Sequence, residues 1–232
     1  MHQERRPVHD DRERHHEDDQ TLHHGRQGVR GNFCQNQQLL VVVNFQHWAN
    51  NFHEFSDIFQ IGAKTYGPDA SAEKAAKQDA SYAGTKKPFG FSVLGMSVYH
   101  GGKKDEFKVL NKEYGKNLNK DNIQDFVNVF FDKANETAMT QALLSVFLAR
   151  LKAIQEMYSN QRVFHIFGSS ILFVYDASIL LDLQASSEAI ESAVVVKMID
   201  FAHVHPANGE PDQNYNFGLD SLIKTLEGTT SA

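Results

Sequence analysis

The stretch VVVKMIDFAH, residues 194–203, decides most of what the sequence predicts about the fold. Its first part is apolar and β-branched, which predicts a buried strand, and the run then ends at Asp200. A carboxylate at a strand end is held in place and still reaches a neighbouring cleft. Phosphotransferases hold Mg²⁺ in this way, because the metal bridges phosphate oxygens and neutralises their charge. The competing explanation is that Asp200 only closes a turn, and the local sequence alone favours it.

A second apolar run, GSSILFVYD at 168–176, follows small hydroxyl residues. We interpret residues 162–176 as two strands that meet near Gly168, and residues 194–201 as a strand that forms a hairpin with the second of them. Ser170, at the start of the run, is a candidate ligand for a metal or a phosphate. A tight turn at the glycine followed by an ordinary strand explains the same pattern.

A short helix is predicted at 70–82, with Asp69 or Ser71 as its N-cap. Three of its side chains share one face at i, i+3 and i+4 spacing, namely Lys74, Lys77 and Gln78. Two ammonium groups and an amide on one face suit a phosphorylated ligand, because lysine acts as a point charge toward phosphate. The solvated face of a surface helix is the competing explanation.

The remaining elements indicate an α+β fold, because strands come early and late and the longer helices lie between them. A further strand is predicted at 91–99, and further helices are predicted at 119–133, 137–158 and 216–226. Asn119 or Asp121 is the expected cap of the first of these helices. The elements do not alternate strand by helix, so a doubly wound parallel sheet is not expected.

Residues 1–38 differ from the rest of the chain in composition. They are rich in His, Arg, Asp and Gln and poor in apolar residues, which predicts disorder. Six of the twelve histidines lie there. A metal site needs ligands that a folded surrounding holds in place, and this segment lacks one, so we do not interpret these histidines as ligands. Residues 39–232 are predicted to be one domain, with a possible buried strand at 39–45.

Overall composition excludes several classes of protein. The chain has 232 residues, is 41% hydrophobic and carries a formal net charge of −6, so it can bury a core but has no global attraction for nucleic acid. No apolar run approaches the roughly 20 residues that span a bilayer, and the N-terminus lacks the apolar core of a signal peptide. Cys34 is the single cysteine and allows no internal disulfide. We expect a monomer in the cytoplasm or the nucleus.

Taken in order, these stretches resemble the inositol-polyphosphate kinase family. Six of them carry the likeness: IGAKTYGPDASAEKAAKQ at 61–78, LGMSVY at 94–99, KEYGKNL at 112–118, SSIL at 169–172, MIDFAH at 198–203 and DQNYNFGLDSLIKTL at 212–226. The first is similar to the segment that follows the family's P-x-x-x-D-x-K-x-G signature. Ala-His after Asp-Phe is most similar to the multikinase branch, and the hexakisphosphate kinase branch is the close alternative.

The resemblance implies a fold akin to protein kinases, in which a small ATP lobe packs on a larger lobe that holds the inositol phosphate. It implies transfer of the γ-phosphoryl group of ATP to a hydroxyl of an inositol phosphate, with Mg²⁺ as cofactor, and a part in phosphatidylinositol phosphate biosynthesis. Such catalysis is positioning plus charge neutralisation.

Site residues are carried over by position. Asp200 would hold Mg²⁺ with help from Ser170, and the three side chains on the helix face (Lys74, Lys77 and Gln78) would face the inositol phosphate. His203 would lie beside the reacting substrate, where it could donate a hydrogen bond or a charge.

The signature itself departs from the family pattern. Counting back from its final Gly62, the Lys position holds Gln60, the Asp position holds Ile58 and the Pro position holds Glu54. Asp57 is adjacent, but a shift of one residue along a strand turns a side chain to the other face. We therefore expect weak or no kinase activity from this chain.

Three explanations of this departure remain open. In the first, residues 1–60 come from a wrong exon or a shifted reading frame. Independently of this choice, residues 39–61 are predicted to be a degraded remnant of a truncated ATP lobe. In the second, the chain binds inositol phosphates without catalysis. In the third, it is an interaction protein for which Lys74, Lys77 and His203 are incidental.

Overall fold

The computed structural model describes residues 55–99, 107–131, 138–176, 179 and 184–228. The disorder predicted for 1–38 and the strand predicted at 39–45 lie outside these ranges and remain predictions.

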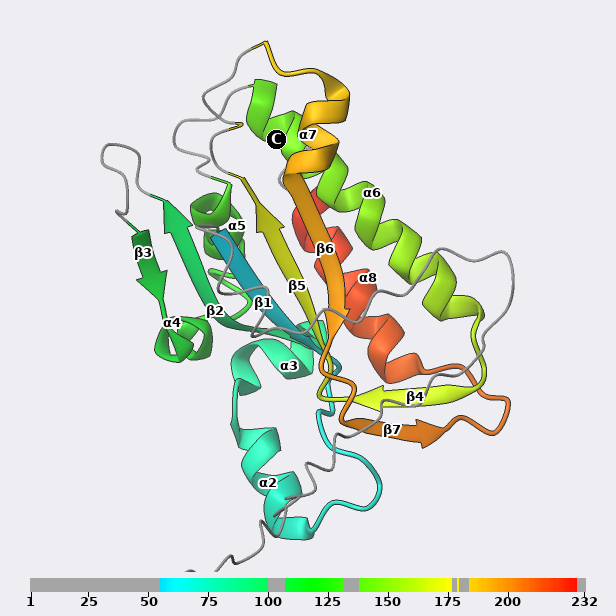
Figure 1. The fold of residues 1–232 in the computed structure, drawn as a ribbon. Coiled ribbons are helices and arrows are strands. Elements are labelled where there is room, and N and C mark those ends of the chain that lie inside the picture. The colour runs from blue at the N-terminus through cyan, green and yellow to red at the C-terminus, as the bar shows by residue number, and fades with distance from the viewer. Residues whose placement is uncertain (1–54, 100–106, 132–137, 177–178, 180–183, 229–232) are drawn as a thin grey trace, which may run out of the picture. The chain divides into compact units, whose positions relative to one another are not determined.

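A five-stranded antiparallel sheet organises the described residues (Figure 1). Its order is β3-β2-β1-β5-β6, built from β1 (Phe55–Ile61), β2 (Phe91–Tyr99), β3 (Phe107–Leu110), β5 (Ser170–Tyr175) and β6 (Val194–Ile199). A separate two-stranded sheet pairs β4 (Phe164–Phe167) with β7 (His203–Pro206). Mixed helices and antiparallel strands confirm the predicted α+β class.

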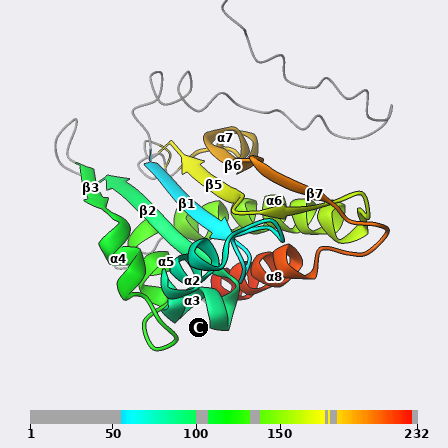
Figure 2. The same cartoon turned by 90° about the horizontal axis from the view of Figure 1, so that it is seen from below.

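Three helices cover one face of the large sheet, as Figure 2 shows: α5 (Gln124–Phe130), α6 (Ala138–Asn160) and α8 (Gln213–Glu227). The core between these layers is strongly aromatic. Phe59 of β1 is fully buried, and its ring centroid lies 5.2 Å from that of Phe126 and 4.8 Å from that of Phe173. Edge-to-face pairs of this kind add about 0.5–1.5 kcal/mol each beyond the area they bury, so β1 is firmly fixed to the helical layer.

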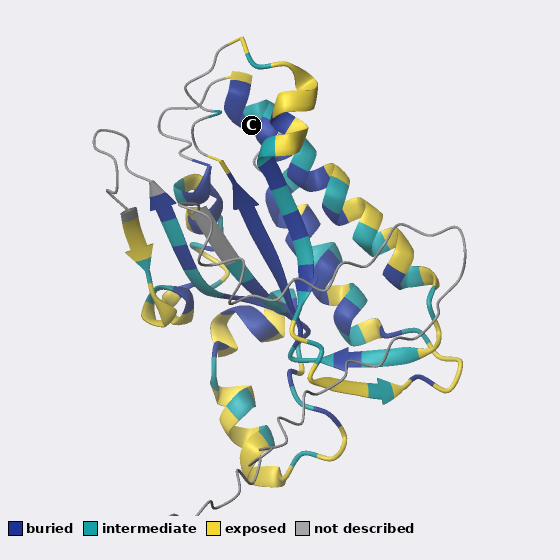
Figure 3. Ribbon diagram, viewed as in Figure 1, coloured by how far each residue is buried: buried dark blue, intermediate teal, exposed yellow. Residues whose placement is uncertain are grey.

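Four shorter helices complete the described fold: α2 (Ala72–Ala80), α3 (Ala83–Phe89), α4 (Lys112–Asn117) and α7 (Ser187–Ala193). The helix α2 has no buried residue and extends away from the end of the large sheet (Figure 3). Its prediction is confirmed with Ser71, and not Asp69, as the N-cap, because the Ser71 hydroxyl accepts a hydrogen bond from Lys74 N at 3.2 Å. The helix ends two residues before Tyr82, which adopts a left-handed φ of 56° and separates α2 from α3.

The cap predicted for the helix at 119–133 is wrong. Ile123 occupies the N-cap position of α5 without a side-chain hydrogen bond, so the helix is shorter than expected. Asn119 instead accepts a hydrogen bond from Asp121 N at 2.9 Å within the preceding turns. A short polar side chain that bonds to nearby backbone favours a turn as readily as a helix start, which explains the error.

Two adjacent strands follow the prediction, but their connection does not. Strands β5 and β6 pair antiparallel along their whole length, as expected of a hairpin. The segment between them contains α7, capped by Ser186, where only a polar connection was expected. Strand β6 ends at Ile199, because Asp200 adopts a left-handed φ of 61°.

The buried carboxylate of Asp212 holds β4 against α6 and α8. It caps α8 by accepting a hydrogen bond from Tyr215 N at 3.0 Å, so this helix begins earlier than the predicted residue 216. The other carboxylate oxygen accepts hydrogen bonds from Tyr158 Oη and from Ile166 N, both at 2.9 Å. Burial, reinforced by the carboxylate, raises the pKa of Tyr158, so this hydroxyl stays protonated and remains a donor.

Candidate functional site

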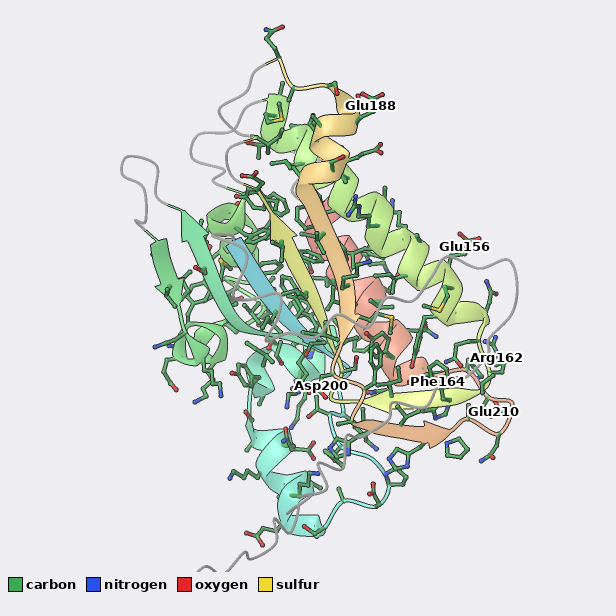
Figure 4. The ribbon with its side chains drawn as sticks, in the orientation of Figure 1. Glu156, Arg162, Phe164, Glu188, Asp200 and Glu210 are labelled. Carbon is green, nitrogen blue, oxygen red and sulfur yellow. The ribbon has the colours of Figure 1, made fainter. Side chains whose placement is uncertain are left out.

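Several predicted site residues come together at one edge of the large sheet, where three of its strands begin or end. Strand β1 ends there, β5 begins there and β6 ends there. The antiparallel register sets Gln60 opposite Ser170, and Ser170 opposite Ile199. Asp200 follows at once, where the chain leaves β6 toward β7 (Figure 4). Two of the predicted site residues, Ser170 and Asp200, are therefore neighbours across adjacent strands.

Asp200 combines an unusual backbone conformation with an exposed side chain. Its φ of 61° lies in the left-handed region, which Asp and Asn tolerate better than other residues with a side chain. The carboxylate is exposed and accepts a long hydrogen bond from Ala202 N at 3.4 Å. An exposed carboxylate that is fixed by a strand end and a tight turn is available to a cation.

Ser169, which was not predicted as a site residue, fixes this turn. Ser169 is fully buried, and its Oγ donates a hydrogen bond to the carbonyl of Ile199 at 2.8 Å, one residue before Asp200. Ser170 is 4% exposed, so of the two predicted metal ligands only Asp200 presents its side chain to solvent. The Ser-Ser pair was the signal in the sequence, but strand register was needed to tell the two hydroxyls apart.

Two signature positions that differ from the family pattern lie in β1, the strand that ends at this edge. Ile58 and Gln60 of β1 stand opposite Leu172 and Ser170 of β5. The amide of Gln60 donates a hydrogen bond from Nε2 to the carbonyl of Gly168 at 3.4 Å. An amide thus occupies the position of the signature lysine, and a hydrocarbon side chain occupies the position of its aspartate.

The predicted phosphate ligands lie on α2, outside the sheet. Lys74 and Lys77 are exposed, whereas Gln78 is half-buried and accepts a hydrogen bond through Oε1 from Thr65 Oγ1 at 3.0 Å. The loop before α2 reaches β7, where Asp69 Oδ1 lies 3.4 Å from His205 Nε2. The helix is therefore tethered to the strand that follows Asp200.

His203 is the first residue of β7 and is exposed. Strand alternation puts His205 on the same face of the two-stranded sheet, and the ring of His205 packs edge-on against Phe167 with centroids 5.6 Å apart. His205 was not predicted from the sequence, because nothing in the local pattern showed that a strand begins at His203.

Within the described ranges, no three His, Cys, Asp or Glu side chains converge on a point that suits a metal ion. A single exposed carboxylate nevertheless fits Mg²⁺ as a partner of phosphates, since this ion keeps several waters and is often held by one or two carboxylates together with substrate oxygens. The exposed carboxylate of Asp200 could serve as one such ligand.

These features define an α+β protein of kinase-like architecture. The model of the family "Inositol polyphosphate kinase" matches residues 57–227, which is most of the chain. The inositol polyphosphate multikinase of Homo sapiens is 35% identical over 119 residues, which cover 51% of this chain and 28% of that protein. The inositol hexakisphosphate kinase 3 of Mus musculus is 32% identical over 181 residues, which cover 72% of this chain and 45% of that protein.

A solved structure of an inositol phosphate multikinase from S. cerevisiae, in complex with ADP and Mn²⁺, has the same fold. Its TM-score is 0.64 at 21% identity, and the match covers 78% of this chain and 80% of that one. The chain belongs to the inositol polyphosphate kinase family, which confirms the resemblance read from its sequence. It spans less than half the length of the two curated relatives described above. None of the described helices is long and apolar enough to cross a membrane.

Proposed function

We propose that this chain binds an inositol phosphate on α2 and a nucleotide with its divalent cation at Asp200, and that its reaction is transfer of the γ-phosphoryl group of ATP to an inositol phosphate hydroxyl. The observation that carries the proposal is the position of Asp200, exposed at the edge where β1, β5 and β6 meet. Family membership, and a relative of similar fold that holds ADP and Mn²⁺, support it.

Each part of the proposed site has a separate task. Lys74 and Lys77 would supply the charge that holds the phosphates of the acceptor, and Gln78 would add a directional hydrogen bond. His203 would donate a hydrogen bond or a charge close to the reacting hydroxyl. Asp200 would hold Mg²⁺, which on binding neutralises charge on the transferred phosphoryl group. The family name supports this substrate class.

The altered signature favours a second candidate, an inositol phosphate-binding protein with little or no catalysis. Ile58 cannot accept a proton or hold a cation, and Gln60 carries no charge to set against the phosphates of ATP. In the β1–β5 register, the neighbouring Asp57 stands opposite Phe173, one position before the pair that Ile58 forms with Leu172. Removal of one preorganised electrostatic group costs roughly 10²–10³ in rate in enzymes that depend on it, so losing two would leave slow turnover at best.

A kinase assay on the unaltered chain and on Ile58→Asp/Gln60→Lys decides between the two candidates. We expect slow ATP-dependent phosphorylation of inositol trisphosphate by the unaltered chain, and a rate about 10²-fold higher or more in the double variant. Both positions are half-exposed, so the strand can carry the charges. Ile58→Asn/Gln60→Met is the matched uncharged control and should stay slow.

The possible outcomes separate clearly. Rapid turnover by the unaltered chain, unchanged in both variants, would show that the signature positions do not limit catalysis. Intact binding of inositol trisphosphate without turnover in any variant would favour the binding protein.

A further inference from the structure

The helix α2 bears the proposed phosphate ligands and yet buries none of its own side chains. A nine-residue helix is too short to be stable alone in water, and this one has no apolar face in the core to hold it. Its place must therefore be set by polar contacts. The strongest group of these contacts lies at its C-terminal end and centres on Lys86 of α3, a lysine that is only 2% exposed.

Three hydrogen bonds connect Lys86, Thr65 and Gln78, and two of them are made by the lysine. Lys86 Nζ donates to the backbone carbonyl of Gln78 at 2.9 Å and to Thr65 Oγ1 at 3.2 Å. Thr65 Oγ1 in turn bonds to Gln78 Oε1 at 3.0 Å, and Thr65 is itself 5% exposed. A lysine buried to this degree is uncommon unless its ammonium group is paired, and here two neutral oxygens and a nearby carboxylate, Asp79, surround it.

The hydrogen bonds of this network set the orientation in which the Gln78 amide lies. An ammonium group can only donate hydrogen bonds, so Thr65 Oγ1 must accept from Lys86. The single hydroxyl hydrogen of Thr65 remains to donate, and in the structure it bonds to Gln78 Oε1, so the amide meets the threonine with its oxygen. We propose that Lys86 and Thr65 are positioning residues, which fix the amide of Gln78 so that its Nε2 is presented as a hydrogen-bond donor to the phosphate groups of the acceptor.

The inference rests on the proposed function and adds to it a reason for selectivity. No described residue accepts a hydrogen bond from Gln78 Nε2, so both of its hydrogens remain for a ligand. An amide turned the other way would present its oxygen to phosphate oxygens, and two acceptors repel each other. A phosphate dianion only accepts hydrogen bonds, so this orientation favours an anionic ligand.

The same threonine connects α2 to the sheet edge. Thr65 lies in the loop that leaves β1, and its carbonyl oxygen packs against Gly168, where an added Cβ would lie 3.1 Å away. Gly168 directly precedes Ser169 and the start of β5. Thr65 therefore lies between the proposed phosphate helix and the edge that carries Asp200, so the network sets the distance between the two halves of the proposed site.

Thr65→Val removes the hydroxyl and keeps the side-chain shape, and Thr65→Ser restores the hydroxyl. Thr85→Val is the matched control, because Thr85 is a fully buried threonine in α3 whose Oγ1 donates to the carbonyl of Tyr82 at 3.3 Å and makes no hydrogen bond to Lys86, Thr65 or Gln78 among the described contacts. Hydrogen exchange without ligand should show faster exchange of the α2 amides in Thr65→Val, and rates close to those of the unaltered chain in Thr65→Ser and Thr85→Val.

Calorimetric titration with inositol trisphosphate, well below the melting temperature of every variant, measures whether the network supports ligand binding. We expect Thr65→Val to weaken binding about tenfold, which is the usual loss when one hydrogen bond to a charged group is removed. In a Gln78→Leu background, Thr65→Val should change the affinity by less than about twofold, because the threonine acts through the glutamine. Thr65→Ser should bind as tightly as the unaltered chain.

Each of the two measurements can overturn the positioning role independently of the other. Additive losses in the double variant, or equal losses in Thr65→Val and Thr85→Val, would overturn the positioning role and leave only a structural one. Unchanged exchange of the α2 amides in Thr65→Val would also overturn it. If the unaltered chain binds no inositol phosphate, the proposed function fails, and so does the proposed role of the network in ligand binding. The exchange measurement still decides whether the network holds α2 in place.

Discussion

Gly218→Ala is expected to destabilise the protein, although alanine is the better helix former. Gly218 lies in α8, where a Cβ would clash with the carbonyl oxygen of Gly90 and would lie 2.8 Å from Ile61 Cγ2 and 3.0 Å from Gly62 N. Two of these contacts are backbone atoms that cannot swing aside. Helix propensity alone predicts a gain of about 1 kcal/mol, but forcing atoms into a packed contact typically costs about 1–3 kcal/mol and more where backbone must move.

We therefore expect the melting temperature of Gly218→Ala to fall by roughly 5 °C or more. Gly228→Ala, at the C-cap of the same helix, is the control, since its added Cβ would meet nothing closer than Gln124 Nε2 at 3.3 Å. A variant at Gly218 as stable as the unaltered chain would show that α8 does not approach the end of β1 as closely as described, and the placement of the sheet edge would then be wrong.

Asp200→Asn is expected to weaken binding of a nucleotide with its divalent cation and to leave the fold intact. Asparagine tolerates the left-handed φ of 61° as aspartate does, so only the charge changes. The uncharged amide oxygen is a much poorer ligand for a divalent cation, and we expect the affinity for ADP with Mn²⁺ to fall by about tenfold or more. Calorimetric titration of both proteins measures the difference.

Asp200→Ala separates charge from backbone strain. Alanine in the left-handed region costs roughly 1–2 kcal/mol, so this variant should lose stability as well as affinity, whereas Asp200→Asn should lose affinity alone. Undiminished affinity in Asp200→Asn would remove Asp200 from the proposed cation site.

The sequence predicted the parts of the fold that have strong local signals. β2 and the meeting of two strands at Gly168 follow from apolar runs bounded by turn residues, and α2 follows from Ser71 and the spacing behind it. Asp200 was found because an acidic residue at the end of an apolar strand is a pattern that short sequence windows can show.

Contacts between distant segments could not be predicted in this way. Ser169, His205 and Lys86 gain their significance from partners at Ile199, Asp69 and Gln78. In sequence, Lys86 is one of two adjacent lysines in a short helix that contains a proline, which gives no sign that it is buried. Strand β7 was missed for the same reason, because four polar-rich residues become a strand only when β4 lies beside them.

The central claim is that α2 binds the phosphates of an inositol phosphate, and direct titration tests it most directly. Inositol trisphosphate is titrated into the unaltered chain, Lys74→Gln/Lys77→Gln and Lys112→Gln, the last an exposed lysine at the start of α4 that serves as control. We predict binding by the unaltered chain and by the control, and an affinity lower by about tenfold to a hundredfold in the double variant. Equal affinities in all three proteins, or no binding by the unaltered chain, would contradict the account.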